Sequence, residues 1–423
     1  MGKVVIFEDK GYENLLPLTH TRAVFELRCG IMLLYQKLIY LYQDLNLEKD
    51  FYYFCREYLK DSLSEKGFLN VNQSLIDSSD SGTTGENVLF VNGRALIEKE
   101  IKIEGPEEVG VDEEDVIYIR TTKTNAQKIT NELLLQEKPA EKIKKLGFKI
   151  VPFKTNLIKY PWELIHHNSD EIIRDFKLQG ITGTIEGKVY EGAHLLNPRN
   201  IFIGRGSYVK PGSVLDAEDG PIYIGEKVKI MPNSAIQGPA YIGDGSSIKM
   251  GAKIYEGTSI GEVCKVGGEV EETIIHSYSN KQHDGFLGHA YLGMWCNLGA
   301  GTSNSDLKNN YGNVKVYVRG KLIDTGSIFV GLTMGDHSKS GINTMFNTGT
   351  VVGVMANVFG EGFPPKYIPS FAWGGREGFQ TYDLEKALEV ARRVMARRDK
   401  ELTSAQEKLL RKIFELTEDE RKW

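Results

Sequence analysis

An aliphatic residue recurs at every sixth position in the glycine-rich second half of this chain. Eight such residues follow one another without interruption, at Ile224, Ile230, Ile236, Ile242, Ile248, Ile254, Ile260 and Val266. The same step occurs earlier, and less regularly later, at Ile203, Val209 and Leu215, at Phe286, Leu292 and Leu298, and at Met334, Ser340, Phe346, Val352 and Val358.

A period of six fits neither a helix nor a simple hairpin. Each unit is expected to be a short strand plus a turn, at which glycine and other small residues let the chain bend sharply. Three units would close one triangular coil, so that the aliphatic side chains point inward and stack into a continuous core. The sequence therefore predicts a parallel β-solenoid over residues 181–362.

Residues 1–180 alternate short apolar runs with helical spacing. KVVIF at 3–7 and NVLFV at 87–91 have the composition of buried strands, whereas 30–45 has the period of an amphipathic helix. This alternation predicts an α/β domain with an open, mostly parallel sheet, closed by a helix at 159–176.

Residues 363–423 are expected to form an extended, proline-containing segment and two amphipathic helices, at 383–401 and 404–418. Ser404 lies three residues before Glu407, as in a capping box. The basic run at 391–400 is read as a solvated helix face, with phosphate-rich coenzyme A as the alternative partner.

Composition excludes several classes of protein. With 52 basic and 57 acidic residues, the net charge of -5 gives no general attraction to nucleic acid or to an anionic membrane. The four cysteines are scattered without a Cys-x-x-Cys pair, which favours a reducing compartment. No long apolar run is present and no convincing set of three histidines could hold zinc. We expect a cytoplasmic protein without a metal in its second half.

The segment SNKQHDGFLGHAYLGMWCNLGAGT runs from Ser279 to Thr302. It resembles the acetyltransferase part of the bifunctional N-acetylglucosamine-1-phosphate uridyltransferase / glucosamine-1-phosphate acetyltransferase family, whose motif closes with Asn-[Ile/Leu]-Gly-Ala-Gly-Thr. Counted back from Asn297 without a gap, the family's catalytic histidine falls on His283, its tyrosine on Phe286, and an acidic position on His289. The resemblance implies a left-handed β-helix in which His283 is the catalytic base.

Two alternatives compete with this assignment. A second alignment places GHAYLG at 288–293 on the family's Gly-His-x-x-Tyr-Leu-Gly, which would make His289 the base. It needs a deletion inside a six-residue unit, which we expect to turn every later core residue off its face, and we reject it for that reason. In the other alternative both histidines are inert, hydrogen-bonded turn residues.

The resemblance also implies ligand contacts along the solenoid. Lys249 matches an arginine that holds the sugar phosphate, although a solvated turn lysine is the alternative, and a second phosphate-site lysine falls on Gly267. Phe286 and Asn297 would contact the sugar, and Lys308 (or Lys315) could supply the lysine of a loop after the closing motif. Acetyl-CoA would contact four later residues, namely Ala300, Gly301, Ile342 and Gly360.

The first domain is similar to sugar-1-phosphate nucleotidyltransferases at NLLPLTHTRAVFELRCG (14–30) and VLFVNGRALI (88–97). In that family a glycine-rich loop wraps the nucleotide phosphates and an aspartate holds Mg²⁺. Here Asn14 replaces the loop's arginine, Val24 a lysine and Arg94 the metal-binding aspartate. Arg22 and Arg28 could still grip phosphates, or could be solvated or salt-bridged structural residues.

Together these features predict a homotrimeric enzyme that transfers an acetyl group from acetyl-CoA to the amine of an amino-sugar 1-phosphate. An imidazole, with an ordinary pKa of about 6.5, can take up the amine proton near neutrality. Nucleotidyl transfer to give a UDP-sugar, with Mg²⁺, is expected only if the first domain is active. The alternatives are a nucleotidyltransferase with a structural β-helix and a non-catalytic sugar-nucleotide-binding trimer.

Overall fold

The computed structural model describes residues 2–75 and 87–422, which divide into two compact units. The first contains residues 1–15, 21–27 and 33–159. The second contains residues 16–20, 28–32 and 160–423. Two short N-terminal segments and the helices expected to close the first domain therefore pack with the solenoid, whereas the sequence places the boundary at 180.

The first unit is built on a six-stranded mixed sheet with helices around it. Its strand order is β2-β1-β3-β6-β5-β7, in which β2, β1 and β3 are parallel, β6 is antiparallel to both neighbours, and β7 is parallel to β5. The bounds are β1 Lys3–Phe7, β2 Phe51–Phe54, β3 Asn87–Asn92, β5 Glu108–Asp112, β6 Asp115–Thr122 and β7 Lys149–Pro152, with a separate pair β4 Ala95–Leu96 and β8 Asn156–Leu157.

The predicted strands of this unit are confirmed, but its helices are shorter than their periodicity suggests. They are α1 Leu34–Leu41, α2 Lys60–Glu65, α3 Lys123–Ala126, α4 Asn131–Leu134 and α5 Pro139–Lys145. The loop after β1 is a 3-10 helix at Lys10–Leu15, and no open phosphate-wrapping loop follows the strand.

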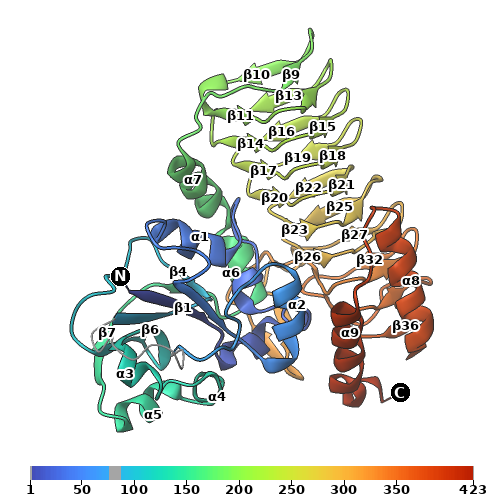
Figure 1. Ribbon diagram of the computed structural model, residues 1–423. Coiled ribbons are helices and arrows are strands. Elements are labelled where there is room, and N and C mark those ends of the chain that lie inside the picture. Colours follow the sequence, from blue (N-terminus) through green and yellow to red (C-terminus); the bar gives the residue numbers. More distant parts are fainter. Residues whose placement is uncertain (1, 76–86, 423) are drawn as a thin grey trace. The chain divides into compact units, whose positions relative to one another are not determined.

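The second unit is the predicted solenoid, whose strands stack in three faces (Figure 1). We call these faces A, B and C, in the order in which the chain visits them. Face A contains β9 Lys188–Val189, β12 Tyr208–Val209, β15 Lys229–Ile230, β18 Ser247–Ile248, β21 Lys265–Val266 and β24 Asn280–Lys281. Asn297 then bridges β24 to β31. The face continues with β31 Lys339–Ser340, β34 Asn357–Val358 and β36 Ala372–Gly375, and β36 pairs with β37 Gly378–Thr381.

Face B contains β10 His194–Leu196, β13 Val214–Asp216, β16 Ala235–Gln237, β19 Lys253–Ile254, β22 Glu269–Glu271 and β25 Phe286–Gly288, with β27 Ser303–Asn304 and β32 Met345–Phe346 beyond them. Face C contains β11 Ile201–Ile203, β14 Ile222–Ile224, β17 Ala240–Ile242, β20 Thr258–Ile260, β23 Ile274–Ser277, β26 Tyr291–Met294, β30 Thr333–Met334, β33 Val351–Val352 and β35 Tyr367–Ile368. The left hand expected for the coil rests on the resemblance to hexapeptide-repeat proteins.

The core of the solenoid is the aliphatic column that the six-residue step predicts. The residues named for that step, from Ile203 to Val358, are buried apolar core residues, except for Ser340, which is polar, and Phe286. Phe286 is wrong as a core position: it lies half-buried on the outer side of β25, and Leu287 points inward beneath Val270 instead.

Coil length is also less uniform than expected. Ile248 pairs with Val266, which is the regular coil of three six-residue units. Val266 then pairs with Lys281, so this coil is three residues shorter. Leu292 and Leu298 are nevertheless buried in the core beyond this point. The corners absorb the missing residues, so a deletion does not turn later residues off their faces, and that reason for rejecting the second histidine alignment is wrong.

Helices cover part of face C and follow the last coils. The predicted helix at 159–176 is two helices, α6 Pro161–His166 and α7 Asn168–Gln179, and Ile172 and Phe176 of α7 pack on Tyr241 of face C. The C-terminal helices are α8 Leu384–Ala396 and α9 Ser404–Leu416. The second begins at Ser404 as expected, but its N-cap is Thr403 rather than Ser404, and Gln406 rather than Glu407 completes the capping box.

An insertion at 305–332 interrupts the solenoid between β27 and β30. It contains an antiparallel hairpin, β28 Lys315–Val318 and β29 Lys321–Asp324. Within the described part of the chain, no helix combines the length and the apolar character needed to cross a bilayer.

Candidate active site

Most of the residues expected to bind ligands lie along one edge of the solenoid, the corner between faces A and B, which we call the AB edge. A Cβ atom on Gly267 would lie 2.9 Å from the Lys249 Cβ in the preceding coil, and one on Gly268 would lie 2.7 Å from the His283 carbonyl oxygen in the next. Successive coils thus place Lys249, Gly267 and His283 one above another.

The same edge continues past His283 to the turn of the closing motif. The Gly301 N–H donates to the Asp284 carbonyl oxygen at 3.0 Å, and the Asn343 N–H donates to the Ala300 carbonyl oxygen at 2.7 Å. Among the described residues no acceptor is found for the Ala300 N–H. The turn therefore presents one amide that can bind an oxyanion, and it is Ala300 rather than Gly301.

Beyond this turn the edge becomes apolar. Ile342 is 74% exposed, and Phe359, which lies over Gly341 of the same edge, is 41% exposed. Gly360 adjoins Phe359 and has a φ of +108°, a conformation that glycine adopts without strain. Exposed apolar side chains gathered along one line are suited to an apolar ligand chain.

A basic surface lies beside Lys249 on the outer side of face A. Burial lowers the pKa of Lys265, and the nearby positive charges of Arg398, Lys249, Arg397 and Lys229 lower it further. The five side chains are therefore close enough to repel one another. Arg397 and Arg398 belong to the basic run at 391–400 noted in the sequence, whereas Lys229 and Lys265 were not singled out, because only the coil geometry shows that residues so far apart share a face.

The remaining expected ligand residues lie off this line. Asn297 forms the bridge between β24 and β31, and its side-chain oxygen accepts from Asn280 Nδ2 at 3.4 Å. Phe286 lies on face B, directly beyond the His283 corner. Lys308 lies in the insertion, where its Nζ donates to the Asn313 carbonyl oxygen at 2.5 Å, and Lys315 begins strand β28 of that insertion.

The two histidines of the motif have contrasting surroundings. His283 is exposed at a bend of the AB edge. His289 lies at the next corner, between faces B and C, and is buried with a φ of +44°. Its Nδ1 is 2.9 Å from Asp306 Oδ2, its Nε2 is 3.1 Å from Glu272 Oε2, and its ring stacks on Phe329 at 5.0 Å.

These contacts exclude His289 as a base near neutrality. Burial alone would lower the pKa of His289, but the hydrogen bonds to Asp306 and Glu272 outweigh burial and raise the pKa to about 9. At pH 7 the ring is therefore already protonated, and both nitrogens are occupied. Its two partners and Phe329 tie both ends of the insertion to the solenoid corner, which is a structural role.

His289 should make stability depend on pH. Its folded pKa lies above the unfolded value of about 6.5, so its contribution is complete below pH 6.5 and is lost as the pH rises through about 9. We expect the unfolding free-energy difference between wild type and His289→Asn, measured in urea, to fall by on the order of 2 kcal/mol between those limits. A difference that does not change with pH would contradict the ion pairs.

In the first unit, Arg94 occupies the position of the family's metal-binding aspartate. It is 1% exposed, and its Nε and Nη2 donate to the two oxygens of Asp9 at 2.7 and 2.6 Å. Nη2 also lies 3.2 Å from Asp115, and Nη1 donates to the Ile158 carbonyl oxygen at 2.7 Å. The guanidinium lies so close to Gly11 that a Cβ there would approach its carbon to 2.3 Å.

These residues do not fit a Mg²⁺ ion. A divalent cation needs free oxygen ligands, but both oxygens of Asp9 are paired with the Arg94 guanidinium, and this fixed positive charge, 3.2 Å from Asp115, repels a second cation. Glu8, the residue before Asp9, is also paired with an arginine. It accepts from Arg56 Nε at 2.6 Å and from Arg56 Nη2 at 3.1 Å. The loop after β1 is thus fixed by two arginines from the ends of neighbouring strands.

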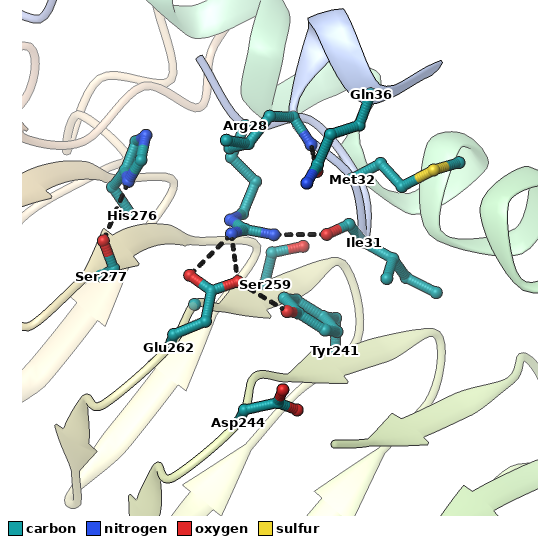
Figure 2. Close-up of polar contacts among 12 residues, drawn as sticks. Arg28, Ile31, Met32, Gln36, Tyr241, Asp244, Ser259, Glu262, His276 and Ser277 are labelled. Atoms are coloured by element: carbon teal, nitrogen blue, oxygen red, sulfur yellow. Dashed lines mark hydrogen bonds and ion pairs between the residues drawn. The ribbon is translucent and has the colours of Figure 1, made fainter. Parts of the chain in front are cut away.

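Of the two roles considered for Arg28, phosphate contact and a structural salt bridge, the structure shows the salt bridge (Figure 2). Its Nη2 donates to both oxygens of Glu262, at 2.7 and 2.9 Å, and Tyr241 donates to the same carboxylate at 3.0 Å. The Arg28 main-chain N–H donates to the Tyr291 hydroxyl at 2.9 Å. Arg28 therefore anchors the segment 28–32 to face C, and its side chain is only 2% exposed. Arg22 is also buried, with 1% exposed.

Comparison with known proteins agrees with this architecture. Residues 4–181 match the sugar nucleotidyl transferase family, and residues 221–256 match six bacterial transferase hexapeptide repeats. The chain is 33% identical over 174 residues to a bifunctional sugar-1-phosphate nucleotidylyltransferase/acetyltransferase of Sulfurisphaera tokodaii, which covers 36% of this chain and 43% of that protein.

A second relative is the bifunctional protein GlmU of Acidithiobacillus ferrooxidans, 38% identical over 112 residues, or 25% of this chain and 24% of that protein. The chain thus matches less than half the length of either relative. A UDP-N-acetylglucosamine acyltransferase structure from Francisella novicida aligns over 55% of this chain and 88% of its own, with 14% identity and a TM-score of 0.29. The chain thus combines a sugar nucleotidyl transferase domain at 4–181 with bacterial transferase hexapeptide repeats at 221–256, and both matches support a transferase.

Proposed function

We propose that the AB edge is the active site of an acetyl-CoA-dependent N-acetyltransferase whose acceptor is an amino-sugar phosphate. The observation that carries this proposal is the order of groups along the edge. A lysine surrounded by other cations comes first, then an exposed imidazole two coils on, then an unoccupied amide, then exposed apolar side chains. Phosphate, reacting amine, thioester carbonyl and pantetheine chain would follow one another in this order.

The chemistry requires a base and an oxyanion site, and the edge offers both. His283 takes the proton from the acceptor amine as the nitrogen attacks the thioester carbonyl carbon. The Ala300 N–H stabilises the negative charge that develops on the carbonyl oxygen. When the intermediate collapses, the carbon–sulfur bond breaks, and the departing thiolate takes the proton back from the imidazolium. No enzyme-bound acyl group is needed.

The acceptor's phosphate is assigned to Lys249 and the cations beside it. Lysine acts as a point charge on a phosphate and does not impose the bidentate geometry of arginine. Asn297 and Phe286, on either side of the edge, are proposed to contact the sugar, and Lys308 to reach it from the insertion. Ile342 and Gly360, with Ala300 and Gly301, would contact acetyl-CoA.

Nucleotidyl transfer is left out of this proposal because of Arg94. The ion pair with Asp9 leaves no carboxylate for Mg²⁺ at the strand end where the family holds it. We therefore expect no Mg²⁺-dependent release of pyrophosphate from UTP or dTTP with sugar 1-phosphates.

The direct test is release of free thiol from acetyl-CoA. Glucosamine 1-phosphate, galactosamine 1-phosphate and unphosphorylated glucosamine should be compared at equal concentration. We expect turnover with an amino-sugar phosphate and a KM at least about tenfold higher without the phosphate, since a charge-assisted contact contributes more than 1.4 kcal/mol. No thiol release with any phosphorylated amino sugar would overturn the proposal.

We further propose that three copies assemble with face A of one against face B of the next. Face A carries the basic surface around Lys265, whereas Glu271 on face B lies in an acidic one. Burial raises the pKa of Glu271, the positive charge of His289 lowers it, and the negative charges of Asp306, Glu256 and Glu272 raise it. The two residues belong to consecutive strands of one coil, so a threefold rotation about an axis parallel to the solenoid would bring them to equal height.

A charge exchange tests this assembly. Lys265→Glu and Glu271→Lys should each shift the mass measured by light scattering from trimer toward monomer, because each places like charges across the contact. The double variant should recover the trimer. Lys321→Glu, on an exposed hairpin outside both faces, is the control and should remain trimeric. Trimers in both single variants would disprove this arrangement.

A further inference from the structure

Lys281 is the one charged residue at an inward position of face A among its first seven coils. It follows Val189, Val209, Ile230, Ile248 and Val266 in the stack, with Leu298 after it. Its side chain is 2% exposed and counts among the largest fully buried ones in the described chain. A lysine here interrupts an aliphatic column, so its presence needs a reason other than core packing.

The ammonium group is directed to the AB edge. Lys281 Nζ donates to the Gly267 carbonyl oxygen at 3.1 Å and to the carbonyl oxygen of His283. These two acceptors belong to consecutive coils at the same corner. The lysine thus ties the bend that carries His283 to the coil beneath it.

The glycines of the preceding coil make room for this contact. A Cβ atom on Gly268 would lie 2.8 Å from Lys281 Nζ, 2.7 Å from the His283 carbonyl oxygen and 2.9 Å from that of Gly285. Gly268 also has a φ of +74°, where a side chain would be strained. The corner is therefore shaped around the ammonium group and leaves no space for a larger residue.

Placing a charge here costs stability. Burial lowers the pKa of Lys281 to about 8, and the negative charge of Asp284 offsets this only in part. A buried charge is costly unless an opposite charge pairs with it, and Lys281 Nζ donates to two carbonyl oxygens rather than to a carboxylate. Groups that cost stability and hold a fixed geometry are concentrated at functional sites.

We propose that Lys281 is a positioning residue for His283. Its ammonium group fixes the bend of residues 282–285 against the preceding coil, and so holds the imidazole at a set place on the AB edge. The effect of Lys281 on catalysis rests on the proposed function. The fixing of the bend by Lys281 is independent of it.

The test compares Lys281→Met with Val266→Met, the neighbouring inward position of the same face. In Lys281→Met, amide hydrogen exchange measured by mass spectrometry should accelerate by at least about tenfold in peptides covering 282–285, and the neighbouring coils should be unchanged. The midpoint of urea unfolding should not fall. The kcat for acetyl transfer should drop by about 10²-fold, because a misplacement of about 1 Å has such an effect, with little change in the KM for acetyl-CoA. Val266→Met should alter neither exchange at the bend nor kcat.

The outcomes separate this inference from the proposed function. Unchanged exchange at the bend in Lys281→Met overturns the inference, whatever the activity. Faster exchange with an unchanged kcat also overturns it, since the bend would then not position the base. Faster exchange in a protein whose wild type transfers no acetyl group supports the fixed bend and refutes the acetyltransferase proposal. A lowered unfolding midpoint would show that Lys281 serves the core, contrary to the inference.

Discussion

Replacing His283 by alanine is expected to lower kcat for acetyl transfer by about 10²- to 10⁴-fold, the usual contribution of a general base. The acceptor amine would lose its proton acceptor, while the phosphate contacts at Lys249 and the apolar end of the edge would be unaffected. The KM values for both substrates should therefore change little. Steady-state thiol release, measured from pH 6 to 9, is the appropriate assay.

His289→Asn is the matched control for this prediction. It removes a histidine six residues away but leaves the AB edge intact, so the pH profile of kcat should keep its shape. Its effect is expected on stability, through Asp306 and Glu272. If His283→Ala retains kcat within about threefold of wild type, or if His289→Asn loses activity while remaining folded, the assignment of the base is wrong.

Replacing Arg94 by methionine is expected to destabilise the first unit by about 3–5 kcal/mol, the usual cost of breaking a buried ion pair. The change would leave the Asp9 carboxylate, 5% exposed, without its guanidinium. Urea unfolding followed by hydrogen exchange in peptides of the first unit, whose residues include no tryptophan, measures the loss. Adding Asp9→Asn should recover part of it, because no buried charge then remains unpaired.

Lys159→Met provides the comparison for a pair on the surface. Lys159 lies 2.8 Å from Glu113, but the two side chains are 39% and 75% exposed, and such pairs contribute about 0–1 kcal/mol. Equal losses in Arg94→Met and Lys159→Met would mean that Arg94 does not have the buried, charge-neutralising role assigned to it.

The solenoid could be predicted from the sequence because its signal is local and repeated. Each inward aliphatic residue is separated from the next by one strand and one corner, so the period appears directly in the chain. The shortened coil between Val266 and Lys281 has no such signal. Corners of different length give the same burial pattern, and the displacement of Phe286 by Leu287 becomes visible only in the strand pairing.

The ligand residues could be predicted only in part. Their alignment along one edge follows from coil geometry, and the sequence already places Lys249, His283 and Ala300 in units of the same repeat. The partners of His289 and Arg28 could not be foreseen, because Asp306 follows a corner of variable length and Glu262 is 234 residues from Arg28. Lys281 did leave a signal: it is a lysine close to the aliphatic step, but the irregular coil conceals its register.

The stacking of coils also sets a scale for what the AB edge can accommodate. Neighbouring strands are about 4.8 Å apart, so the separation between any two groups on the edge changes only by whole multiples of that spacing. Duplicating the coil between Lys249 and His283 would move the phosphate-binding lysine away from the imidazole by one strand spacing, without altering either side chain. The number of coils therefore sets the distance between the two groups, and acceptors of different length could be selected by adding or removing coils.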